Sequence, residues 1–163
     1  SIISMLAIGA WLVAAGADWR WATVLLIALA ALVLLIPLAS PARPARQRDV
    51  ILIVTPLALL AGWLTIATSL NALTVLTAEG VIRDENATLW AIGAIAVAAV
   101  AALIVFLRGG ALAYPVPLIW GLIAVFVAER DHRPEAAWFA AGTALLLAAI
   151  LAWRAFARRN TLT

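Results

Sequence analysis

The sequence has no cysteine and no lysine, and it contains one histidine, His132. The absence of cysteine excludes disulfide bonds, thiolate metal sites and thiol catalysis. One histidine cannot supply a pair of axial haem ligands from this chain. Charged residues make up 12% of the 163 residues, whereas a soluble domain has roughly 25%. The composition is therefore not that of an ordinary soluble domain.

Hydrophobic residues make up 67% of the chain, and the mean hydropathy is +1.13. Six apolar runs approach or reach the roughly 20 residues that a helix needs to cross a bilayer. These runs are residues 2–17, 21–39, 50–78, 87–107, 111–128 and 135–156. They are continuously apolar, whereas the strands of a membrane barrel alternate. The sequence predicts an all-α fold, a polytopic transmembrane helix bundle that forms a single integral membrane domain over residues 1–163.

The connections between the runs contain residues that end and begin helices. Gly80 is a stop signal after the third run, and Asp84 or Asn86 is a start signal for the fourth. Pro134 is placed to occupy the first turn of the sixth helix. The chain begins at Ser1 with neither an initiator Met nor a basic flank, so we expect that part of the protein precedes residue 1.

All eleven basic residues are arginine, and they lie in the short connections. This placement indicates topology signals rather than a nucleic-acid surface, so the expected partner is the lipid bilayer. One side of the membrane would hold Arg43, Arg46, Arg48, Arg108, Arg154, Arg158 and Arg159, and the other Arg20, Arg83, Arg130 and Arg133. The positive-inside rule then predicts that the 40–49 loop and the C-terminus are cytoplasmic.

No Asp, Glu, Lys, Arg or His lies in the middle of any of the six runs. Proton relays, ion pathways and voltage sensors need such groups, which disfavours a pump, a secondary transporter or a channel. The sequence also offers no carboxylate pair, metal-ligand cluster or nucleophile with its base. We therefore predict no catalytic and no metal-binding residue, and a protein that binds rather than catalyses.

Part of the third run, "TPLALLAGWLTIATSLN" at 55–71, is unusually rich in hydrogen-bonding side chains. On a helix, one side of the third run carries Pro56, Leu60, Trp63, Ala67, Asn71 and Thr74. Trp63 lies in the middle of the span, away from the interfacial belt where Trp concentrates. The amide of Asn71 needs a partner in hydrocarbon, and this partner is either a ligand or a neighbouring helix.

Small residues occupy a neighbouring face of the third run. They are Ala58, Gly62, Thr65 and Ser69. Such a face lets another helix approach closely. In the fifth run, Tyr114, Pro117, Leu118 and Gly121 share a side, and the run also carries Trp120. The two runs are therefore alike in combining small residues with a Trp.

The remaining tryptophans divide by their depth in the predicted spans. Four lie at the ends of runs and are expected to be interfacial anchors: Trp19, Trp21, Trp138 and Trp153. Trp90 is similar. Trp11 lies deeper and is a candidate ligand contact.

The order Pro56, Gly62-Trp63, Thr65, Ala67, Asn71 resembles the last helix of the translocator-protein family, the tryptophan-rich sensory proteins (TspO). The spacing is most similar to that of a divergent bacterial branch with extra spans after this helix, and "LIWGLIAV" at 118–125 resembles the second Trp-bearing span of that branch. On this resemblance the first three runs correspond to family helices three to five, and the two opening helices precede residue 1. Ile8 stands where the family's third helix has an Asn.

The resemblance implies a non-enzymatic sensory protein of the bacterial inner membrane, with a tetrapyrrole (porphyrin, haem or bacteriochlorophyll type) or a similar lipophile as a ligand and no required cofactor. Trp11, Pro56, Trp63 and Asn71 are the ligand residues that it carries over. To these we add Thr74 as a polar contact and Trp120 as a second indole.

Two alternatives to this function remain open. One is a structural or accessory subunit, packed in a photosynthetic or respiratory complex or as a homodimer. The other is an enzyme that turns over the bound lipophile through Trp.

Overall fold

The computed structural model describes residues 2–40, 46–109 and 111–160, and this part of the chain is helical without strands. Six main helices are present: α1 (Ile2–Gly16), α2 (Arg20–Ala39), α4 (Thr55–Ala78), α5 (Ala87–Gly109), α6 (Pro115–Glu129) and α7 (Pro134–Asn160). Three short elements adjoin them: α3 (Gln47–Asp49), a π-helical turn η1 (Val50–Val54) and a 3₁₀ turn η2 (Asp84–Asn86). The predicted fold class, a helical bundle, is confirmed.

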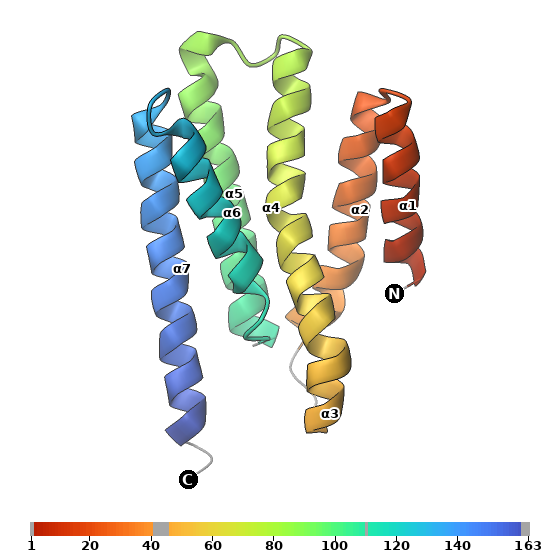
Figure 1. The fold of residues 1–163 in the computed structure, drawn as a ribbon, viewed down its shortest axis with the longest axis vertical. Coiled ribbons are helices and arrows are strands. Elements are labelled where there is room, and N and C mark those ends of the chain that lie inside the picture. The colour runs from red at the N-terminus through yellow and green to blue at the C-terminus, as the bar shows by residue number, and fades with distance from the viewer. Residues whose placement is uncertain (1, 41–45, 110, 161–163) are drawn as a thin grey trace.

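The helices run up and down in chain order (Figure 1). Helices α1 and α2 form a hairpin on one side, α4 lies in the middle, and α5, α6 and α7 form the other side. The turns after α1, α4 and α6 lie at the upper end of the figure, whereas α1 begins and α7 ends toward the lower end. Among the described residues, the arginines of the two predicted groups therefore lie at opposite ends of the bundle.

Four helical stretches are long and apolar enough to cross a membrane: Arg20–Ala39, Gln47–Ala78, Asp84–Arg108 and Pro134–Arg158. Helices α1 and α6 are apolar but have 15 residues each, so they are about 22 Å long. The fifth apolar run was predicted from residue 111, but α6 begins at Pro115. Residues 41–45 of the predicted cytoplasmic loop lie outside the described residues.

The helix ends follow the local signals in the sequence. Gly80 has a φ of +71° directly after α4, in the left-handed region that a glycine adopts without a Cβ penalty. The side-chain carbonyl of Asn86 accepts a hydrogen bond of 3.0 Å from the backbone N–H of Arg83, which closes the turn before α5. Pro134 is the first residue of α7, where its missing N–H breaks no helical hydrogen bond.

The core of the bundle is built largely from alanine. Ala30, Ala58, Ala61, Ala102 and Ala140 have no exposed surface. Side chains of this size let helix backbones approach closely, which is how helices associate where lipid removes the hydrophobic driving force. Larger side chains such as Phe106, Leu118 and Leu147 fill the rest of the core, and many other large apolar side chains, such as Leu25, Val97 and Leu145, are exposed on the outside of the bundle.

Candidate functional site

Helices α4 and α6 cross at a pair of glycines. A Cβ atom on Gly62 would overlap the backbone carbonyl oxygen of Tyr114, and it would lie 3.2 Å from the Leu118 side chain. On the other side of the contact, a Cβ on Gly121 would lie 3.0 Å from Cγ1 of Ile66. The small-residue face predicted for the third run therefore packs against the side of the fifth run that carries Tyr114, Leu118 and Gly121.

A buried hydrogen bond fastens the same crossing. The hydroxyls of Thr65 and Tyr114 lie 3.1 Å apart, and Tyr114 is fully buried. Thr65 also donates to the carbonyl of Ala61 at 2.9 Å, so its hydroxyl accepts the hydrogen bond of the phenol. This contact fixes the lower part of α6 against α4.

Above the crossing, α6 leans toward α7 and away from α4, while α5 lies behind both (Figure 1). The divergence opens a groove of about 470 Å³ between the three helices, within the range of small-molecule sites. The side chains that surround it are Trp63, Ile66, Ala67, Ser69, Leu70 and Leu73 of α4, Ala91, Ala94 and Ile95 of α5, and Trp120, Gly121, Ala124, Val125, Ala128 and Glu129 of α6.

The surface of this groove is almost entirely apolar. Trp63 is 50% exposed and Trp120 is 67% exposed, so both indoles are open to an incoming ligand. Alanines on α5 and α6 leave the space that larger side chains would fill. Two polar side chains adjoin the groove: Ser69, whose hydroxyl lies 3.5 Å from the carbonyl of Thr65, and Glu129.

A second hollow, of about 720 Å³, lies between α4 and α5. It shares Ser69, Leu73 and Ala94 with the first groove and includes Trp90 and Asn86. On α5, its other residues are exposed, whereas the first groove meets residues that are buried or half-buried. The two hollows therefore adjoin each other along α4 and α5.

The structure brings together two of the six predicted ligand residues, Trp63 and Trp120. Pro56 and Thr74 are exposed on α4 and do not adjoin the groove. The hydroxyl of Thr74 donates to the carbonyl of Leu70 in its own helix at 3.0 Å.

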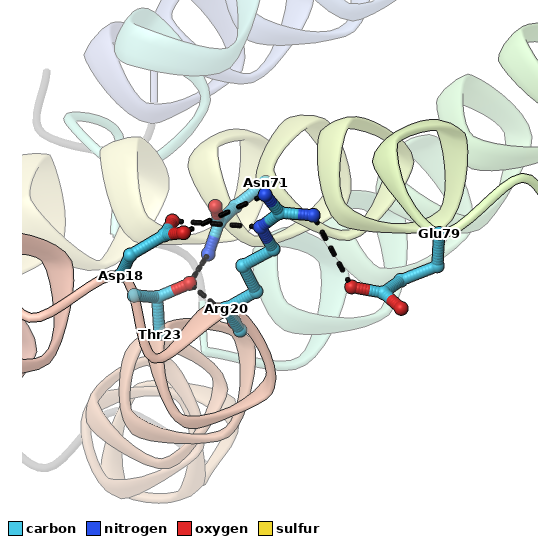
Figure 2. A network of polar contacts seen from close by, with 5 residues as sticks. All are labelled: Asp18, Arg20, Thr23, Asn71 and Glu79. Carbon is cyan, nitrogen blue, oxygen red and sulfur yellow. Dashed lines mark hydrogen bonds and ion pairs between the residues drawn. The ribbon is translucent and has the colours of Figure 1, made fainter.

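Asn71 points to α2, on the other side of α4 from the groove (Figure 2). Its amide nitrogen donates to the hydroxyl of Thr23 at 3.1 Å, and this hydroxyl donates to the carbonyl of Arg20 at 2.6 Å. The guanidinium of Arg20 pairs with Glu79 at the end of α4 and with Asp18, each at 3.4 Å. Asn71 thus holds a neighbouring helix as part of a polar network that fastens the α1–α2 hairpin to α4.

Trp11 lies on α1, which packs against α2 alone within the described residues. Its indole nitrogen is buried and has no hydrogen-bond partner there. Trp11 therefore lies apart from the groove between α4, α5 and α6.

The sequence did not predict two features of the groove: the small residues of α6 that line it, and the carboxylate of Glu129 at its end. Gly121, Ala124 and Ala128 follow one another at helical spacing, and this stripe was the available signal for a face without large side chains. Glu129 directly follows the fifth apolar run in the sequence, and its place beside the groove depends on the tilt of α6.

Within the residues that the structure describes, no three His, Asp or Glu side chains gather closely enough to hold a metal ion. A family model described as "TSPO-like protein" matches residues 1–153, which is nearly the whole chain. No curated protein and no solved structure matches the chain.

Proposed function

The chain belongs to the TSPO-like family, and from this premise we propose that it binds a lipophile such as a tetrapyrrole in the groove between α4, α5 and α6. It is an integral membrane protein, and we propose a sensory, non-enzymatic role in which occupancy of the groove is the signal. The observation that supports this proposal is the placement of two half-open indoles, Trp63 and Trp120, beside one apolar groove.

The chemistry of the groove suits a flat apolar ligand. Indoles offer π-faces that stack on another ring at little cost in conformational entropy. The small side chains of the alanines that line the groove leave room for the ligand and give it an apolar surface to pack against. No charge has to be desolvated along most of the groove.

The experiment is a titration of the purified protein in detergent with octaethylporphyrin, a tetrapyrrole without carboxylates, with tryptophan fluorescence as the signal. Wild type should show saturable quenching, and Trp63→Leu should lose most of the affinity. Trp153→Leu is the matched control, because Trp153 is similarly exposed, at 65%, but lies on α7 outside the groove. Equal quenching of wild type and Trp63→Leu would remove the support for this site.

A second candidate function, an accessory subunit of a larger membrane complex or a homodimer, is favoured by the position of α1. This helix contacts only α2 within the described residues, and large side chains such as Ile2, Leu6 and Val13 are exposed along it. A partner at a fixed stoichiometry after purification in mild detergent would support this function. A monodisperse single chain would count against it.

We also propose that the end of the bundle with α3 and the end of α7 is cytoplasmic, in a bacterial inner membrane. Because the chain has no cysteine, single cysteines are clean reporters. With Ser40→Cys and Val81→Cys in intact spheroplasts, an impermeant maleimide should label position 81 alone. Labelling of position 40 alone would reverse the orientation.

A further inference from the structure

The two ends of the groove differ in charge. Trp63 and Trp120 lie at one end, near the crossing of α4 and α6. Glu129, the last residue of α6, lies at the other end and is the one charged side chain among the described residues that surround the groove. Glu129 follows Trp120 by nine positions along the helix, a rise of about 14 Å. The groove is therefore amphipathic along its length.

The carboxylate of Glu129 is only partly used by the protein. Its Oε2 atom accepts a hydrogen bond of 2.8 Å from Nη1 of Arg133. No hydrogen bond to Oε1 is formed within the described part of the chain, so this oxygen can accept one from a ligand. The side chain of Glu129 is 29% exposed, and Arg133 does not adjoin the groove.

The helix dipole at this end of the groove also favours a positively charged group on the ligand. Glu129 closes the C-terminal turn of α6, where the helix dipole attracts positive charge. An anionic head group would instead face the carboxylate of Glu129, because Arg133 is already engaged by it. The charges therefore select against a carboxylate or a phosphate in this position.

We propose that Glu129 determines the specificity of the groove, which takes an amphiphile with an aromatic, apolar body and a protonated amine as its polar end. The body lies against Trp63 and Trp120, and the amine donates to Oε1 of Glu129. This inference rests on the proposed function, since it names the class of ligand for the same groove.

Three probes that share one body test the proposal: 1-pyrenebutylamine, 1-pyrenebutanol and 1-pyrenebutyric acid. Energy transfer from tryptophan to pyrene reports binding, with protein-free micelles as the correction for partitioning. Wild type should bind the amine roughly tenfold more tightly than the alcohol, because the ammonium forms an ion pair with Glu129 whereas the hydroxyl forms only a hydrogen bond with it. The acid should bind more weakly than the alcohol.

Two variants of the groove end and one control separate the role of Glu129 from general charge effects. Glu129→Gln should bind amine and alcohol about equally, with its affinity for the alcohol unchanged. Arg133→Gln frees both carboxylate oxygens and should bind the amine more tightly than wild type. Glu135→Gln is the matched control, because Glu135 is an exposed acid in the first turn of α7 outside the groove, and it should keep the wild-type preference.

The outcomes distinguish the two proposals. A preference for the amine that survives in Glu129→Gln overturns the role of Glu129, and so does equal binding of the three probes to wild type. Weaker amine binding by Arg133→Gln also overturns it, because a purely structural ion pair would give that result. If none of the probes binds saturably, or if Trp63→Leu binds all three as wild type does, the proposed function fails instead.

Discussion

Replacing Gly62 by alanine should force α4 and α6 apart. The added methyl group would overlap the backbone carbonyl of Tyr114, and it would also press on Leu118 and Pro117 at 3.2 Å. A backbone carbonyl inside a helix pair cannot turn away as a flexible side chain can. Overpacking of this kind typically costs 1–3 kcal/mol, and we expect Gly62→Ala to lose about 2–3 kcal/mol of unfolding free energy.

The matched control for this substitution is Gly142→Ala. Gly142 is exposed within α7, and a Cβ there meets nothing within 4 Å. This control should be as stable as wild type or up to about 1 kcal/mol more stable, because alanine is the better helix former. Unfolding in mixed micelles of rising SDS fraction, followed by circular dichroism, measures both. If Gly62→Ala unfolds at the same SDS fraction as Gly142→Ala, the close crossing of α4 and α6 is refuted.

Three further substitutions test the contacts that hold the helices together, each by the same SDS titration. Tyr114→Phe removes the hydrogen bond to Thr65 and should cost about 0.5–1.5 kcal/mol; no loss would show that this bond contributes nothing. Asn71→Leu breaks the bond to Thr23 and should cost about 0.6–1.7 kcal/mol while porphyrin affinity stays unchanged; a loss of affinity would place Asn71 at the ligand. Arg154→Leu uncaps the last carbonyls of α5, which the guanidinium binds at 2.7 and 3.1 Å, and should cost about 1–3 kcal/mol; a neutral result would contradict this capping role.

The sequence predicted the helices well because their signals are local. A continuous apolar run in lipid has to be a helix, because a helix forms the hydrogen bonds of its backbone N–H and C=O groups within the segment itself. Gly80 and Pro134 mark helix ends for reasons that involve only their own backbones. The role of the small-residue face around Gly62 was also predictable, because such a face allows close packing against any neighbouring helix, whichever helix that is.

The site was less predictable because it depends on how helices tilt. Helical spacing placed Trp63 and Asn71 on one side of α4, yet Asn71 is turned to α2 while Trp63 adjoins the groove. The groove exists because α4 and α6 diverge above their crossing, and no residue of either helix encodes this divergence alone. Glu129 lies beside the groove because of the same divergence of α4 and α6.

The most direct test of the proposed site is to fill the groove and measure binding. Ala124 is an exposed residue of α6 that adjoins the groove, so Ala124→Phe places a ring in the space without displacing a buried side chain. Ala149→Phe is the matched control, because Ala149 is exposed on α7 and does not adjoin the groove.

The dissociation constant of octaethylporphyrin should rise at least about tenfold for Ala124→Phe, a loss of about 1.4 kcal/mol, and should stay at the wild-type value for Ala149→Phe. Wild-type affinity in Ala124→Phe would show that the ligand does not occupy the groove between α4, α5 and α6.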